Sequence, residues 1–109
     1  GQRELKAGAL VQAEAHFTAA LGLVALPSLR ATLHTNRAEA RLLRGRPAGA
    51  LEDAEAALEV DGSGEAALLF RGLAELGVRR FADAARTLRA VPSRSQDPAL
   101  QQRAAAAAR

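Results

Sequence analysis

The stretch ATLHTNRAEARLLRGRPAGALEDAEAALEVDGSG, residues 31–64, decides the fold because it contains one complete structural unit. A helical pattern of apolar residues is interrupted at Gly45-Arg46-Pro47, and a second one then continues to the loop-forming residues 61–64. Glycine and proline are typical of the ends and starts of helices. The stretch therefore predicts two helices joined by a short turn, which is a helical hairpin.

Small residues recur along the chain at nearly the same spacing as this unit. The steps are 37 residues (Gly1 to Ala38) and then 34 residues (Ala38 to Gly72). The predicted second helices show the same two steps, and their small residues are Ala13, Ala50 and Ala84. The break between helices also recurs, at Gly8, Gly45 and Arg79. Because two helices approach closely only where side chains are small, we expect the hairpin to be repeated.

A helical hairpin that repeats about every 34 residues resembles the tetratricopeptide repeat (TPR). The resemblance covers residues 1–92, as a truncated first repeat (about 1–28), a complete second (31–64) and a nearly complete third (65–92). Phe17 and Phe81 fall where the family favours aromatic residues, whereas His34 and Arg41 occupy its usual tryptophan and tyrosine positions. The resemblance implies an all-α solenoid of about three helix-turn-helix repeats in a single domain, 1–109.

The two ends of the chain are predicted as follows. A first helix should turn at Gly8, and the second should span about 9–25, after which the next helix opens near residues 28–32. At the other end, Asp97-Pro98 is a helix start signal, with an N-cap residue followed by proline. Residues 97–109 are predicted to form a capping helix over the last repeat. The alternative is the beginning of a long helix that leads to further domains.

Length and composition favour one helical domain. The chain has 109 residues, of which 49% are hydrophobic and three are phenylalanine. It lacks an apolar run of the ~20 residues that a membrane span needs, and also a signal-peptide pattern. Cysteine is absent, which fits a cytoplasmic protein without disulfides. Because Gly1 falls inside a predicted helix, we expect the chain to be part of a longer protein.

The charge is +3, with an isoelectric point near 10.9 and Lys6 as the single lysine. Such a bias is compatible with nucleic acid or an acidic partner. It is also compatible with a coding bias toward arginine and alanine. The arginines are scattered among twelve acids, and no basic stripe with aromatic residues is present. Nucleic-acid binding through arginines is kept only as an alternative.

Catalytic chemistry has little support in the sequence. The two histidines, His16 and His34, lack a second histidine or a carboxylate at metal-ligand spacing. Gly62-Ser63-Gly64 falls at a predicted helix end, where glycine is expected for backbone reasons. We therefore predict no enzyme, no metal site, no catalytic residue and no cofactor.

The concave face of stacked hairpins is the predicted binding site, because it is lined by the first helix of each repeat. The expected function is protein–protein interaction, in which this groove binds a peptide or helix of a partner protein. The chain is expected to be part of a larger scaffold or adaptor protein. The predicted contacts are Gln2, Lys6, Thr35, Asn36, Glu39, Leu69, Phe70 and Leu73. Leu69, Phe70 and Leu73 are expected either to form an apolar pocket or to be covered by the C-terminal helix.

A second hypothesis comes from Asn36-Arg37-Ala38, which is similar to a segment of TPR co-chaperones. In that family, asparagine amides and basic side chains hold the C-terminal Glu-Glu-Val-Asp tail of heat-shock chaperones. Of the positions that can be compared only Asn36 matches, since Gln2, Ala66 and Phe70 stand where the family has asparagine, lysine and a basic or aromatic residue. A co-chaperone adaptor with a degenerate clamp is therefore an alternative.

Overall fold

The structure is a computed structural model that describes residues 2–92, with side chains described from residue 7 onward. The elements of this part are α1 (Gln2–Leu23), α2 (Pro27–Leu43), α3 (Pro47–Val60), α4 (Glu65–Gly77) and α5 (Phe81–Ala90). No strand occurs among the described residues. The predicted all-α class is confirmed. The predicted capping helix, 97–109, lies outside the described residues.

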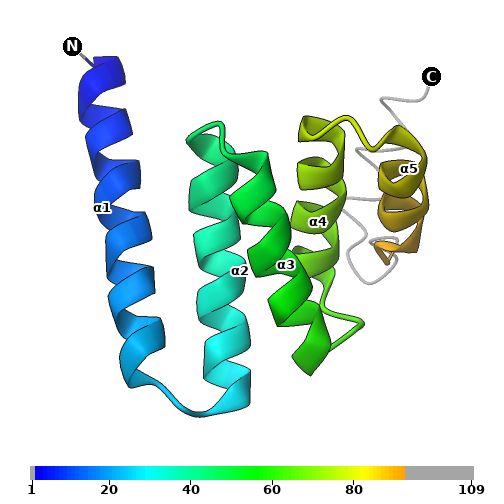
Figure 1. The fold of residues 1–109 in the computed structure, drawn as a ribbon, viewed down its shortest axis with the longest axis horizontal. Coiled ribbons are helices and arrows are strands. Elements are labelled where there is room, and N and C mark those ends of the chain that lie inside the picture. Colours follow the sequence, from blue (N-terminus) through cyan, green and yellow to red (C-terminus); the bar gives the residue numbers. More distant parts are fainter. Residues whose placement is uncertain (1, 93–109) are drawn as a thin grey trace, which may run out of the picture.

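The helices are arranged in chain order, each antiparallel to the next (Figure 1). Each helix packs against its successor, and α2 also contacts α4. A contact between alternate helices shows that successive hairpins stack on each other. The arrangement is therefore solenoid-like, and α2, α3 and α4 form its centre.

The turns α2–α3 and α4–α5 have the same backbone conformation, 34 residues apart. Gly45 and Arg79 both have a left-handed conformation, with φ of 76° and 67°. In each turn this residue donates to the carbonyl three residues earlier, and the next residue donates to the carbonyl five residues earlier. This is the Schellman pattern of helix ends. The predicted breaks at Gly45 and Arg79 are confirmed.

The first predicted hairpin is wrong, because α1 continues through Gly8 as one helix. A glycine inside a helix costs only about 1 kcal/mol, and Gly8 lacks the proline that follows Gly45 two residues later. Pro47 and Pro27 instead lie at the first position of α3 and α2, where proline suits a helix start. As a result α2 begins four residues before the predicted repeat boundary at residue 31, and α1 ends at Leu23 rather than at residue 25.

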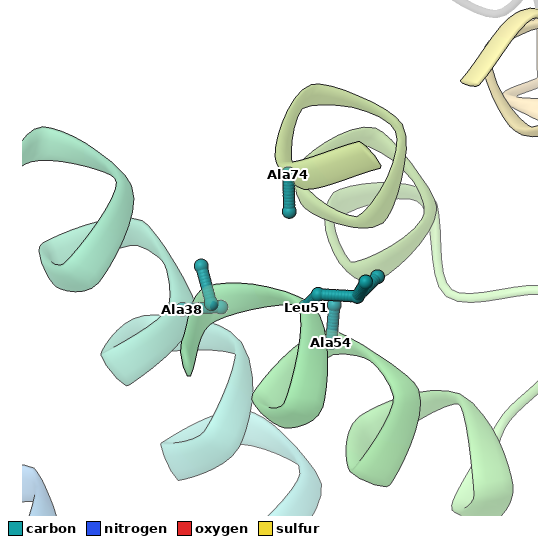
Figure 2. Close-up of a cluster of buried hydrophobic side chains, with 5 residues drawn as sticks. Ala38, Leu51, Ala54 and Ala74 are labelled. Carbon is teal, nitrogen blue, oxygen red and sulfur yellow. The ribbon is translucent and has the colours of Figure 1, made fainter. Parts of the chain in front are cut away.

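The centre of the core is made of small residues from three successive helices. Ala38 of α2, Leu51 and Ala54 of α3, and Ala74 of α4 meet there (Figure 2), together with Ala50. Four of these five side chains are alanines with 0% of their surface exposed, which lets the helix backbones approach closely. The partly buried residues Leu42, Phe70 and Val78 pack around them. Ala38, Ala50, Gly72 and Ala84 are buried, which agrees with a packing cause in the second and third repeats, whereas Ala13 of the first is only half-buried.

The α1 helix is less deeply buried than the rest. On its predicted core face Leu21 is buried, but Phe17 and Leu10 are only half-buried. Arg30 of α2 holds its C-terminal end by donating to the carbonyl oxygens of Leu21 and Val24. None of the helices within residues 2–92 has the length and apolar character needed to cross a membrane.

Candidate functional site

A hollow of the described surface lies where α2, the end of α3 and the start of α4 meet. It has a volume of about 510 Å³, within the range of about 300–1,000 Å³ that is typical of ligand sites. We call it the α2–α4 groove, and it is lined by Ser28, Ala31, Thr32, Thr35, Asn36, Ala57, Val60, Asp61, Gly64, Glu65, Ala66 and Ala67. The predicted contacts Thr35 and Asn36 are thus placed side by side in one groove.

One wall of the groove is a polar face of α2. Ser28, Thr32, Thr35 and Asn36 lie on it at helical spacing, with Ala31 between them. Thr35 Oγ1 donates to the carbonyl of Ala31 over 2.8 Å, and Thr32 Oγ1 donates to the carbonyl of Ser28 over 3.2 Å. The opposite wall and floor are formed largely by the small residues of α3 and α4. The lining is therefore mostly apolar surface from small side chains, with the polar groups of α2 along one wall.

A carboxylate stands at the end of α3 beside this wall. Asp61 Oδ1 accepts hydrogen bonds from the backbone N–H and the hydroxyl of Ser63, at 3.0 and 2.8 Å. These two bonds lower the pKa of Asp61 below its ordinary value, the hydroxyl being the larger cause. Asp61 is therefore ionised at neutral pH. Among the described residues that line the groove, none is basic.

The predicted apolar contacts lie next to the groove rather than inside it. Leu69 and Phe70 line a second hollow of about 380 Å³, which shares Glu65 and Ala66 with the groove. Phe70 also packs against the alanine core, so it is partly structural. Leu69 is 38% exposed and Leu73 is 40% exposed, but Leu73 lines neither hollow.

Three further predicted contacts are placed elsewhere or not described. Glu39 is exposed one turn beyond Thr35 on α2 and is not part of the groove lining. Gln2 and Lys6 lie in α1, where the structure describes their backbone but not their side chains. Of the predicted contacts, the structure therefore places Thr35 and Asn36 in the groove and Leu69 and Phe70 in the adjoining hollow.

The most extensive polar structure is a layer of ion pairs between α1, α2 and α3, which we call the ion-pair layer. Its centre is Asp53 of α3, only 2% exposed. Arg37 donates to both carboxylate oxygens, with a shortest distance of 2.7 Å between Nη2 and Oδ1. Arg41 Nη1 donates to Oδ2 over 2.9 Å, and His34 Nδ1 lies 2.9 Å from Oδ1. An ionised carboxylate only accepts hydrogen bonds, so Nδ1 of His34 carries the proton.

The layer extends to α1 through Glu14. Arg41 Nε donates to Glu14 Oε2 over 2.9 Å, and Arg44 Nη1 donates to Oε1. Burial raises the pKa of Glu14, but the hydrogen bonds and charges of these two arginines outweigh burial and hold the pKa below its ordinary value. Arg37 also donates to Thr18 Oγ1 over 3.0 Å. The layer therefore fixes how α1 sits on the hairpin α2–α3.

Sequence reasoning missed this layer because it treated the arginines as scattered. The available signal was the row His34, Arg37, Arg41 and Arg44, which are three, four and three residues apart on one face of α2. A second signal was Asp53, which shares a helix face with Ala50 and Ala57, three residues before it and four residues after it. Three of these arginines are paired inside the chain, which weakens the nucleic-acid alternative.

A scan against models of protein families finds no match, and a search of curated proteins finds no similar sequence. Within the described part of the chain, no three His, Cys, Asp or Glu side chains are grouped so that they could hold a metal ion. Inferences about function therefore rest on the shape and chemistry of the groove.

Proposed function

We propose that this chain is a TPR-like interaction module that binds an extended segment of a partner protein in the α2–α4 groove. The carrying observation is that Thr35 and Asn36, predicted as contacts, line a groove of about 510 Å³ between alternate helices. The same turn geometry 34 residues apart and the contact between α2 and α4 support the solenoid-like reading. Concave surfaces of this kind are what solenoid proteins use for binding.

An extended segment fits the groove better than a bulky helix. The floor and far wall are alanine and glycine at Ala57, Gly64, Ala66 and Ala67, which leave room for a backbone. The wall of α2 offers hydroxyl and amide groups that can pair with main-chain groups of a peptide. Leu69 and Phe70 in the adjoining hollow then supply an apolar contact for one side chain of the bound segment.

The co-chaperone alternative receives less support. A terminal carboxylate needs several converging donors, and within the described lining Asn36 is accompanied by Ala66, where the family has lysine, and by Asp61. A free chain end would place its negative charge beside that carboxylate. We therefore do not propose binding of a heat-shock chaperone tail.

The groove is tested with peptides selected from a random library displayed on phage. Each selected peptide is titrated against the wild type and against Ala66→Arg, which fills the groove from an exposed position shared by both hollows. The matched control is Ala82→Arg, because Ala82 is also an exposed alanine at the second position of a helix but lines neither the groove nor the adjoining hollow.

We expect Ala66→Arg to weaken binding at least about tenfold, as for a central interface residue, and Ala82→Arg to leave it unchanged. If no peptide is enriched, or if both variants bind like the wild type, the groove is not the binding site. Equal losses in both variants would point to a general change in the fold rather than to the groove.

A further inference from the structure

We propose that the α2–α4 groove accepts a segment that carries a lysine or arginine side chain, and that this cation lies beside Asp61. The inference rests on the proposed function and adds the chemistry of the partner. It depends on three features of the described lining: its hydrogen-bonding character, its charge and its helix ends.

The wall of α2 presents mainly hydrogen-bond acceptors. A hydroxyl has one proton and two lone pairs. Both threonines donate their hydroxyl proton to a backbone carbonyl of α2. Thr32 and Thr35 therefore offer acceptors to a ligand. Asn36 offers one acceptor and two donors, and its side chain has no hydrogen-bond partner among the described residues. A donor-rich group, such as an ammonium or a guanidinium, matches this wall.

The charge of the lining has the same preference. Asp61 Oδ1 is used by Ser63, but Oδ2 has no hydrogen-bond partner among the described residues, and the residue is exposed. Glu65 also lines the groove, but it has a partner within the chain, which leaves Asp61 as the carboxylate available to a ligand. No described side chain of the lining is basic, so a cation meets attraction without a competing positive charge.

The helix ends at the groove do not reverse this preference. Each helix end carries about half an elementary charge, positive at the N-terminus and negative at the C-terminus. The end of α3 at Val60 and the start of α4 at Glu65 both border the groove, so their partial charges largely cancel. The start of α2 is weakened as an anion site because Pro27 has no N–H group. The full charge of Asp61 therefore dominates.

The test uses three acetylated and amidated peptides that differ only in charge. The first is Ser-Leu-Lys-Ala-Lys-Leu-Ser, and the others have both lysines replaced by glutamine or by glutamate. Each is titrated into the ¹⁵N-labelled chain at low salt, and the amide shifts of Thr35, Asn36 and Ala66 give the affinity. The variant is Asp61→Asn, which keeps an oxygen that can accept from Ser63. Its matched control is Glu55→Gln, an exposed acid of α3 outside the groove.

We expect the lysine peptide to bind about threefold to fivefold more tightly than the glutamine peptide, as for one exposed ion pair, and the glutamate peptide to bind most weakly. Asp61→Asn should remove the difference between lysine and glutamine peptides, and Glu55→Gln should keep it. High salt should remove it as well, since exposed charges are screened.

Equal binding of the lysine and glutamine peptides, or tighter binding of the glutamate peptide, overturns the charge preference and leaves the groove function intact. A preference for lysine that survives in Asp61→Asn also overturns the inference, because the cation then lies elsewhere. If none of the three peptides shifts the groove amides, the inference fails together with the binding of extended peptides in this groove.

Discussion

The hairpins α2–α3 and α4–α5 share a backbone but differ in the polar groups between their helices. Arg37 and Arg71 are equivalent, 34 residues apart, and Asp53 is matched by Thr87. In the first hairpin Asp53 accepts hydrogen bonds from two arginines and a histidine. In the second, Thr87 offers no charge to Arg71.

The second hairpin is left with unmatched polar atoms. Glu75 stands where the first hairpin has Arg41, and its Oε2 lies 3.6 Å from Arg71 Nε on the same helix. Arg71 Nε and Glu75 Oε1 are both buried, and neither has a hydrogen-bond partner among the described residues. Because both hairpins form the same turn and the same close packing, the fold depends on small residues and turn geometry. The ion pairs of Asp53 instead join α2 to α3, and those of Glu14 tie α1 to this hairpin.

The apolar contacts of the two hairpins differ in a compensating way. Ala38 and Ala54 belong to the alanine core of the first hairpin, and their equivalents are Gly72 and Leu88. A Cβ atom on Gly72 would lie 2.5 Å from Leu88 Cδ2. Where the first hairpin has two alanines, the second thus has a glycine, which is smaller, and a leucine, which is larger. The contact between the two helices of a hairpin is therefore filled in two ways.

The largest expected effect comes from Asp53→Ala. It leaves Arg37, Arg41 and His34 half-buried without their carboxylate, and breaking a buried ion pair costs about 3–5 kcal/mol. The equivalent change in the second hairpin, Thr87→Ala, should cost about 1 kcal/mol. Urea unfolding followed by circular dichroism measures both, and hydrogen exchange should show the first loss of protection in α1. Similar costs for the two variants would mean that the ion-pair layer does not distinguish the hairpins.

The next effect concerns the compensating pair. Gly72→Ala should destabilise the chain by about 1–3 kcal/mol through overpacking against Leu88. In the background of Leu88→Ala the same change should be neutral or favourable, because the methyl group then has room. The control is Gly8→Ala, where nothing lies within 4 Å of the added carbon and alanine should stabilise α1 by up to about 1 kcal/mol. Additive costs of Gly72→Ala and Leu88→Ala in urea unfolding would refute the compensation.

The two turns can be compared directly because Gly45 and Arg79 have the same conformation. A non-glycine residue in the left-handed region costs about 1–2 kcal/mol. Arg79→Gly should therefore raise the free energy of unfolding by about 1 kcal/mol, and Gly45→Ala should lower it by a similar amount. Thermal denaturation of both variants measures the effect. A decrease in Arg79→Gly would show that the arginine makes a contact that outweighs its backbone strain.

The smallest expected effect is the pH dependence of the stability that Glu14 contributes. Glu14 belongs to the ion-pair layer, which the second hairpin lacks. Its pKa is lower in the folded chain than its ordinary value of 4.5. The stabilisation is therefore fully present above that value and is lost as the pH falls through the lower, folded pKa. The difference in unfolding free energy between wild type and Glu14→Gln should shrink as the pH falls from 7 to 3. Asp61 titrates in both proteins, so its contribution cancels from the difference in unfolding free energy. A difference that stays constant from pH 7 to 3 would exclude a stabilising role for the ionised Glu14.

The recurrence of small residues was the most accurate sequence signal, because it reports a backbone distance. It predicted the hairpins 31–64 and 65–92, in which the structure has the helices 47–60, 65–77 and 81–90. The turn at Gly8 failed because one glycine without a following proline is compatible with a continuous helix. Leu73 and Glu39 are exposed but lie outside the two hollows, because helical spacing predicts a face of a helix but not where the surface beside it is hollowed.

By itself, the sequence determined the all-α class, the turns at Gly45 and Arg79 and the close packing of alanines in the second and third repeats. These follow from local backbone preferences and from side-chain size, which act over a few residues. Only the tertiary structure decided which charges pair. Asp53 meets Arg37 and Glu14 meets Arg44 across 16 and 30 residues, and such partners become neighbours only after helices stack. The same stacking brings the polar wall of α2 beside Asp61, and the proposed preference for a cation rests on this arrangement.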